Sequence, residues 1–353
     1  MIGVDMVLFY HLSPPTHLHP LSKRDLLSPS DLSREELDNL LDLAARFKTR
    51  SMTRSLAGKT VGLLFFDPSL RTRVSFDVAT TQLGGHCLMI DADKEIYGLE
   101  PLEKAVMDGA AEEHVKDAAL TLSRYVDALG VRHLDRTGDW ELDRQDCLLR
   151  SYATHASVPV INLESTQHHP CQAFADMMTI QERLVRTDSR KLTLAWCNHP
   201  EPKAMGVSHS AATVAAMMGM DVTIAHPLGF ELDPDVMEQI HAQAKKSGGS
   251  VRIVNDLTEG AQGCDVLYAR SWGSHKYWND PEREAMVKRS FASWRVDDRI
   301  MDETNNAIFM HPLPVRRNVI ATDSVLDGER SVIYDQAENR VHVQKALLVQ
   351  LLN

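Results

Sequence analysis

The sequence has few cysteines, and they form no disulfide or metal-binding pattern. Five cysteines are scattered through 353 residues, and no two of them make a Cys-x-x-Cys pair. An odd number of isolated cysteines is typical of a reducing compartment and not of a secreted, disulfide-stapled domain. We therefore expect free thiols and a cytoplasmic protein.

Long apolar runs and an excess of basic residues are also missing. No segment approaches the ~20 apolar residues of a membrane-spanning helix. Residues 1–24 are partly apolar and then proline-rich, with no basic region in front, so we expect an N-terminal extension that is neither signal peptide nor anchor. The formal net charge of −11 argues against nucleic acids and anionic membranes as partners, because both reward a basic surface. Local arginines would have to attract any anionic substrate.

Apolar runs alternate with helical patterns along most of the chain, which is typical of parallel α/β sheets. A length of 353 residues is too long for one ordinary core. We expect two doubly wound domains, residues 25–185 and 186–335, with a C-terminal helix over 336–353 that returns to the first. Strands are predicted at 59–66, 87–90, 126–131, 158–162, 191–196, 221–225, 251–254, 265–268 and 307–310. Helices are predicted after Ser33 and Ser69 and near 111–125, 141–154, 170–184, 206–218, 233–246 and 282–291.

The segment Ser69-Leu70-Arg71-Thr72-Arg73 lies between the first predicted strand and the helix after it. A turn of this kind aims the free N–H groups of residues 69–72 outward at the positive end of the helix dipole. The two hydroxyl groups and the Arg71 guanidinium add donors that suit phosphate oxygens. We interpret the segment as an anion-binding site; a capped surface helix whose arginines pair with carboxylates is the alternative.

Ligands of doubly wound sheets bind beyond the carboxyl ends of the strands, so chemistry-bearing residues are sought there. Each candidate also has a simpler interpretation: Arg132 as a surface ion pair, His169 as a helix cap and Trp272 as a core residue. A zinc site built from His168, His169, Cys171, Cys197 and His199 is rejected because their spacing matches no common zinc motif. The candidates at strand ends are Arg132, Glu164, His169, Gln172, Arg270 and the segment 311–318.

Together these motifs resemble the aspartate and ornithine carbamoyltransferases. The resemblance covers about residues 26–352. Met107-Asp108-Gly109, the loop 199–202, Ser271-Trp272-Gly273 and the segment 314–318 resemble the acetylornithine and succinylornithine branch of this family. The resemblance implies a carbamoyl phosphate domain, an amino-acid domain knotted near its proline-rich loop, and a homotrimer with shared active sites. Its motifs are Ser-x-Arg-Thr-Arg (69–73), Gly130-Val131-Arg132, His169-Pro170-x-Gln172, Leu313-Pro314 and Ala337-Glu338-Asn339-Arg340.

The resemblance also implies roles for individual residues. Arg132, His169 and Thr72 are expected to be catalytic, because attack of a neutral amine on carbamoyl phosphate builds negative charge on the carbonyl oxygen. Glu164, Arg270 and Leu313 are expected to bind an acyl-ornithine, and neither a metal nor a cofactor is needed. Carbamoyl phosphate is expected to contact Ser69, Leu70, Arg71, Thr72, Arg132, His169, Gln172, Pro312, Leu313, Arg340 and, from a neighbouring subunit, Tyr97.

Four positions depart from the family pattern. Tyr97 replaces a tryptophan, Arg270 and Ile320 each replace a lysine, and Pro312 replaces a cysteine. Proline offers an approaching amine neither a thiol nor an N–H, although its carbonyl remains. Two hypotheses are therefore kept: an active carbamoyltransferase, and a catalytically silent relative that binds carbamoyl phosphate.

One position bears on the choice of amine substrate. Glu112 falls where acetylornithine enzymes carry glutamate and succinylornithine enzymes carry proline, so N-acetylornithine is the expected substrate. An acidic residue in the first turn of a helix, stabilising its dipole, is the simpler interpretation of Glu112. Ile320 and residues 229–234 are closer to the succinylornithine relatives, which keeps that substrate as the alternative.

Overall fold

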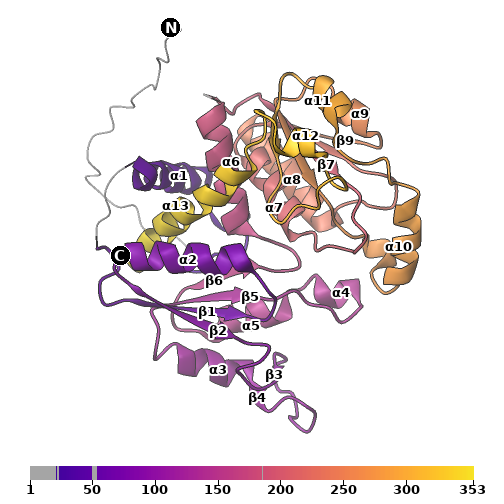
Figure 1. Cartoon of the computed structure of the whole chain (residues 1–353). Helices are drawn as coiled ribbons and strands as arrows, with labels where there is room; N and C mark the ends of the chain where they lie inside the picture. The colour runs from indigo at the N-terminus through magenta and orange to yellow at the C-terminus, as the bar shows by residue number, and fades with distance from the viewer. Residues whose placement is uncertain (1–20, 22–23, 50–53, 185) are drawn as a thin grey trace.

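The computed structural model describes Leu21 and residues 24–49, 54–184 and 186–353. The predicted extension, residues 1–24, lies outside the described residues except for Leu21 and Arg24. Figure 1 shows two α/β units, each built around its own sheet. The two doubly wound domains expected from the alternation of apolar runs are confirmed as a fold class, whereas the domain boundaries and the knot stay predictions.

The first sheet is parallel throughout, with the strand order β2-β1-β5-β6. Its strands are β1 (Thr60–Phe65), β2 (His86–Asp91), β5 (Ala128–Arg132) and β6 (Val160–Glu164). Helices α2 (Leu70–Gln82) and α13 (Ile333–Leu352) lie on one face, and α3 (Val115–Leu122) and α5 (Cys147–His155) on the other (Figure 1). Helix α1 (Arg34–Thr49) begins after Ser33, which exchanges capping hydrogen bonds with Glu36.

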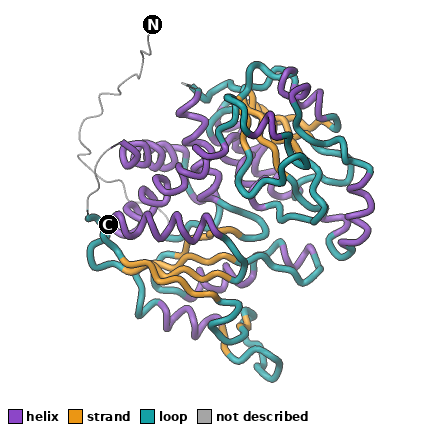
Figure 2. Tube along the Cα trace, viewed as in Figure 1, coloured by secondary structure: helices purple, strands orange, loops and turns teal. Residues whose placement is uncertain are grey.

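The second sheet is also parallel, with the order β11-β10-β7-β8-β9. Its strands are β7 (Lys191–Trp196), β8 (Asp221–Ala225), β9 (Ser250–Val254), β10 (Val266–Arg270) and β11 (Ile308–Met310). The helices of this unit are α7 (Gly206–Met217), α8 (Pro234–Ser247), α9 (Leu257–Ala261), α10 (Pro281–Arg289), α11 (Asp298–Asp302) and α12 (Asp323–Leu326). Figure 2 shows the strands in two separate groups, with helices packed around each.

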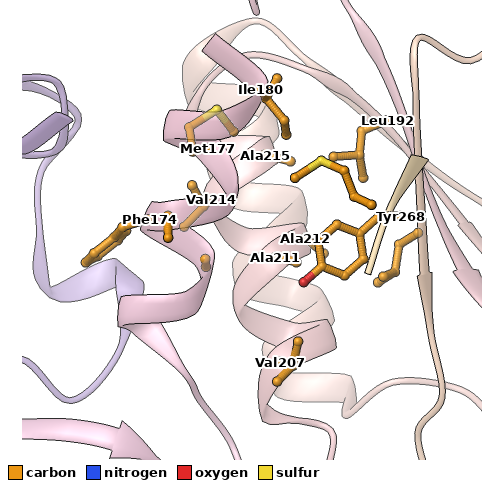
Figure 3. Close-up of a cluster of buried hydrophobic side chains, with 14 of the residues drawn as sticks. Phe174, Met177, Ile180, Leu192, Val207, Ala211, Ala212, Val214, Ala215 and Tyr268 are labelled. Atoms are coloured by element: carbon orange, nitrogen blue, oxygen red, sulfur yellow. The ribbon is translucent and has the colours of Figure 1, made fainter. Parts of the chain in front are cut away.

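Two helices join the units. Helix α6 (Pro170–Arg183) contacts α7 of the second unit. Helix α13 packs against α1, α2 and α6, as expected for a C-terminal helix that returns to the first domain, and it also contacts β11 of the second unit. Figure 3 shows apolar side chains between α6, α7 and the second sheet, among them Ile180, Leu192 and Tyr268, whereas Phe174 points from α6 to the side away from α7. Most of α6 is buried, so the residues at its start have little freedom to move.

Two local predictions are wrong. The helix expected over 141–154 is divided into α4 (Trp140–Asp143) and α5, because Asp146 between them has a left-handed backbone with φ 49°. Its carboxylate accepts hydrogen bonds from Ser165 Oγ (2.6 Å) and Thr166 N (3.0 Å), so tertiary contacts hold this conformation.

The helix expected over 111–125 is confined to α3, and a short parallel pair, β3 (Leu99–Glu100) and β4 (Glu113–His114), precedes it. Glu112 lies before β4 and donates its backbone N–H to Gly98 O at 3.1 Å. The interpretation of Glu112 as a first-turn helix residue is therefore wrong. Within the described residues, no helix is long and apolar enough to cross a membrane.

Candidate active site

The carboxyl ends of strands from both sheets face one cavity of about 950 Å³. Parallel strands all end at the same edge of a sheet, which brings residues that are distant in sequence to this place. Arg132 ends β5, Glu164 ends β6 and Arg270 ends β10. The cavity is also lined by Ser69, Leu70, Arg71, Thr72, His169, Gln172, Pro312, Leu313 and Arg340, so it gathers every predicted site residue except Tyr97 and Glu112.

The strand-to-helix turn predicted at Ser69 is present between β1 and α2. Ser69 is the N-cap of α2, and its hydroxyl accepts the Thr72 N–H at 3.3 Å. The N–H groups of Leu70 and Arg71 lie in the first turn, where a helix offers free donors at its positive end. The Arg71 guanidinium makes no hydrogen bond or ion pair with another described residue, and it is half-buried at the cavity. These donors together suit a phosphate group.

A buried charge cluster lies next to this turn. Arg132 Nη1 donates to Glu164 Oε2, and His169 Nε2 lies 3.6 Å from the same oxygen. Burial opposes ionisation of Glu164, but the charge of Arg132, the charge of Arg270 and the hydrogen bond from Arg132 outweigh it and hold the pKa of Glu164 below its ordinary value. Glu164 is therefore ionised at neutral pH, and Oε1 accepts no hydrogen bond from any other described residue.

His169 is a neutral imidazole in this surrounding. Burial lowers the pKa of His169 well below its ordinary value, and the charges of Arg340, Arg132 and Arg270 act in the same direction against Glu164. Its Nδ1 is buried and has no hydrogen-bond partner among the described residues. A neutral imidazole has one N–H, which it can donate to a carbonyl oxygen. It forms no ion pair with Glu164, as an imidazolium would.

Arg340 connects three helices at the floor of the cavity. From α13 it donates to Thr72 Oγ1 on α2 at 2.7 Å and to Gln172 Oε1 on α6 at 3.2 Å. All three side chains are at most 4% exposed. Burial, with the charge of Arg132, lowers the pKa of Arg340 to about 10, which leaves the guanidinium charged at neutral pH.

The opposite wall of the cavity comes from the second unit. Arg270, Pro312, Leu313 and Ile320 all lie on it. The Leu313-Pro314 peptide is cis, and Pro312 and Ile320 are buried. Helix α7 reaches the loop before His169 because Gly206 has no side chain: a Cβ there would lie 2.6 Å from Ser165 O. Ser210 of α7 then accepts the His169 N–H at 2.8 Å.

The cavity is cationic although the protein is acidic. Seven lysines and arginines line it against four aspartates and glutamates, while the whole chain carries a formal charge of −11. Low-dielectric walls strengthen such a local field and raise the concentration of anions in a cleft. The cavity therefore suits an anionic ligand although the net charge of the chain is negative.

Several lining residues escaped the sequence analysis. Lys203 follows the end of β7, so the strand-end rule could have found it, as it found Arg316 in the segment 311–318 after β11. Tyr277 and Asn279 lie seven and nine residues beyond β10, where no sequence signal marked them. Trp272, by contrast, is fully buried and donates to Phe230 O, which confirms its interpretation as a core residue.

Two predicted site residues lie outside the cavity lining. Tyr97 is 65% exposed, and Glu112 is also exposed. Both belong to the segment that surrounds β3 and β4. A metal site is not found: within the described ranges, no three or more His, Cys, Asp or Glu side chains are grouped so that they could hold an ion.

Comparison with known proteins gives a consistent match over the whole described fold. Residues 24–182 match the aspartate/ornithine carbamoyltransferase carbamoyl-P binding domain, and residues 191–351 match the Asp/Orn binding domain of the same family. The chain is 42% identical over 335 residues to N-acetylornithine carbamoyltransferase of Xanthomonas campestris pv. campestris, covering 94% of this chain and 98% of that protein. It is 38% identical over 341 residues to ornithine carbamoyltransferase of Methanopyrus kandleri, covering 95% and 99%.

Solved structures agree with these relatives. The crystal structure of acetylornithine transcarbamylase complexed with acetylcitrulline has a TM-score of 0.91 to this chain at 41% identity, and the match covers 93% of this chain and 99% of that one. A variant of N-acetyl-L-ornithine transcarbamylase complexed with carbamyl phosphate and N-succinyl-L-norvaline gives the same TM-score, identity and coverage.

Proposed function

The chain belongs to the aspartate/ornithine carbamoyltransferase family, and we propose that it transfers the carbamoyl group of carbamoyl phosphate to the side-chain amine of N-acetylornithine. The products are N-acetylcitrulline and phosphate, as a step of arginine biosynthesis in the cytoplasm. The observation that carries the proposal is the joint presence, around one cavity, of an anion-binding helix start and a buried set of carbonyl donors.

Carbamoyl phosphate binds with its phosphate at the start of α2. Backbone N–H groups, Ser69, Thr72 and Arg71 hold the phosphate oxygens. Its carbamoyl group lies over Gln172, with Leu313 and Pro312 offering backbone carbonyl oxygens to the amide N–H groups. The acyl-ornithine enters from the wall that carries Arg270 and Leu313, and the free Oε1 of Glu164 accepts from its amine.

The neutral amine then attacks the carbonyl carbon. Negative charge develops on the carbonyl oxygen, where Arg132, Thr72 and the neutral His169 are the donors. The bond from the carbonyl carbon to the phosphate oxygen breaks, and phosphate leaves with the electron pair and takes the amine proton. Positioning of two substrates and fixed donors supply the catalysis, with no metal or organic cofactor.

A homotrimer with shared sites is the proposed assembly. The exposure of Tyr97, outside the cavity lining of its own chain, supports a role for it in the cavity of a neighbouring subunit. Other large apolar side chains are exposed on the same segment and at the start of α2, among them Leu70, Val74, Leu102 and Val106. These exposed apolar side chains support the proposal of a contact with another subunit.

An assay of citrulline formation tests the proposed function. Purified protein is given carbamoyl phosphate with ornithine, N-acetylornithine or N-succinylornithine, and the ureido product is measured by its colour reaction. We expect N-acetylornithine to give the highest kcat/KM. Pro312 supports the alternative of a silent relative because it has no N–H to offer; binding of carbamoyl phosphate without product from any amine would establish that alternative.

Substitution of Glu112 tests the choice of acyl group. A succinyl group adds a carboxylate, and two like charges ~4 Å apart at an effective dielectric near 20 repel by about 4 kcal/mol. Glu112→Pro is therefore expected to shift kcat/KM from N-acetylornithine towards N-succinylornithine. Glu113→Pro, one residue along, is the matched control. An unchanged ratio in Glu112→Pro would remove Glu112 from the selectivity site, and a wild-type preference for N-succinylornithine would overturn the proposed substrate.

A further inference from the structure

Asp176 is a buried carboxylate beneath the proposed site. Its hydrogen-bond partners are two side-chain amides and a hydroxyl, and none of them is a cation. Asp176 is on α6, one helical turn after Gln172 and two turns after His169, so the three share one face of the helix. It is 3% exposed. Three side chains from different elements donate to it: Gln172 Nε2 at 2.8 Å, Gln336 Nε2 at 2.9 Å and Tyr268 Oη at 2.7 Å.

Two of these hydrogen bonds, those from Gln172 and Gln336, continue towards the cavity. Gln172 uses its other end, Oε1, to accept from Arg340, and Arg340 in turn donates to Thr72. Gln336 uses Oε1 to accept the backbone N–H of His311 at 2.9 Å, immediately before Pro312 and Leu313. Asp176 is thus connected through one glutamine to Arg340 and Thr72, and through the other to the loop on the opposite wall.

The chemistry of the partners leaves only one orientation for each glutamine amide. An ionised carboxylate only accepts, while a guanidinium and a backbone N–H only donate. The amides of Gln172 and Gln336 must therefore point their NH₂ groups to Asp176 and their oxygens to Arg340 and His311. Burial raises the pKa of Asp176 to about 6, against the hydrogen bonds from Gln336, Gln172 and Tyr268, so the carboxylate is ionised above that pH.

We propose that Asp176 is a positioning residue that orients the Gln172 and Gln336 amides and thereby fixes Arg340 and the 311–313 loop on the two sides of the reacting carbonyl. Without this acceptor, either amide can flip and turn its NH₂ group towards a group that only donates. Arg340 and the 311–313 loop would then move away from the carbamoyl group. Asp176 acts only through these groups, because it touches no substrate itself. The assignment goes beyond the proposed function and rests on it for the identity of the substrate.

The test uses the full-length protein with two substitutions of Asp176. Asp176→Leu removes the acceptor, and Asp176→Asn keeps the size and one acceptor oxygen. Thr179→Val is the matched control, because Thr179 is buried on the same helix and accepts a hydrogen bond from Asn339 of α13 that leads away from the cavity. The control separates general weakening of the α6–α13 contact from loss of orientation. Unfolding temperature, Kd for carbamoyl phosphate by calorimetry and kcat/KM are measured for each.

Asp176→Leu is expected to weaken carbamoyl phosphate binding and lower kcat/KM, each by about 10- to 100-fold, the range for a buried donor left without its acceptor. Asp176→Asn is expected to restore part of this loss, and Thr179→Val to lower the unfolding temperature with Kd and kcat/KM unchanged. Gln336→Met should raise both the KM for the acyl-ornithine and the Kd of carbamoyl phosphate, because it frees the loop that carries Pro312 and Leu313. The rise in Kd should be smaller than in Asp176→Leu, because the branch through Gln172 to Arg340 stays in place.

The proposal is overturned if both Asp176 variants change Kd and kcat/KM no more than Thr179→Val does. If Asp176→Leu does not fold, Asp176→Asn decides alone, and it must then differ from the control. Failure of the proposed function is a separate result: wild-type protein would form no product from any acyl-ornithine, while calorimetry with carbamoyl phosphate would still show whether Asp176 orients the donors.

Discussion

Arg132→Ala is expected to lower kcat by about 100-fold or more, which is the usual loss when one donor to a developing oxyanion is removed. The guanidinium is 9% exposed at the end of β5, and Glu164 takes one of its N–H groups. Its Nε is buried without a hydrogen-bond partner among the described residues. A fixed, desolvated cation with donors to spare stabilises charge without having to reorganise. Initial rates at saturating concentrations of both substrates measure the loss.

Arg71→Ala provides the contrast. Arg71 is expected to hold the phosphate in both the ground state and the transition state, so its loss should mainly raise KM for carbamoyl phosphate. The two variants should therefore separate into a kcat effect at β5 and a KM effect at α2. Wild-type activity of either variant at limiting carbamoyl phosphate would show that the site is assigned wrongly.

Stability needs its own control at Arg132. Removal of one partner of a buried ion pair leaves an uncompensated charge and costs about 3–5 kcal/mol of unfolding free energy. The buried contact with Glu164 thus makes Arg132→Ala less stable than wild type, a cost that the sequence did not indicate. The double variant Arg132→Ala/Glu164→Gln removes that charge; it should recover part of the unfolding temperature and none of the turnover.

Mixing two inactive variants is expected to restore activity. If Tyr97 completes the site of a neighbouring subunit, Tyr97→Ala subunits contribute an intact cavity and Arg132→Ala subunits contribute an intact Tyr97. Random assembly of equal amounts in a cyclic trimer pairs the intact halves at about a quarter of the sites. Activity should therefore rise from near zero to about a quarter of the wild-type value after the two proteins are dissociated together and reassembled.

Two measurements make this result decisive. Arg71→Ala mixed with Arg132→Ala is the control, because both residues line the cavity of one chain and no mixed pair of subunits should rebuild a site. Sedimentation gives the oligomeric state of each sample. A fully active monomer, or a mixture no more active than its two components, would contradict the shared site.

Several features of the site could be predicted because they follow from local sequence. The spacing of apolar residues predicts the order of strands and helices. Ser69, which follows an apolar strand, indicates where α2 begins. Once parallel strands were expected, the rule that ligands bind at their carboxyl ends selected Arg132, Glu164, His169 and Arg270. The family motifs added Arg340, whose place on the C-terminal helix gave no local signal of a role.

Other features arise only from contacts between distant residues. The break between α4 and α5 depends on Asp146 accepting hydrogen bonds from Ser165 and Thr166, which no local pattern around Asp146 reveals. Glu112 lies in an extended segment because its backbone N–H donates to Gly98 O and not to a carbonyl of a preceding helical turn. Lys203 and Tyr277 reach the cavity because loops of the second unit fold over it.

The sequence by itself determined the fold class, the family and most of the residues that line the cavity, because strand periodicity, helix starts and motif spacing are local properties of the chain. Only the tertiary structure decided how those residues act on one another. The protonation states of Glu164 and His169 depend on burial and on arginines that come from other strands and helices. The orientation of Gln172 depends on Asp176 of the same helix and on Arg340, which reaches Gln172 only because α13 packs against α6. Charge and hydrogen-bond direction are set by neighbours in space, and a linear sequence does not state which neighbours those are.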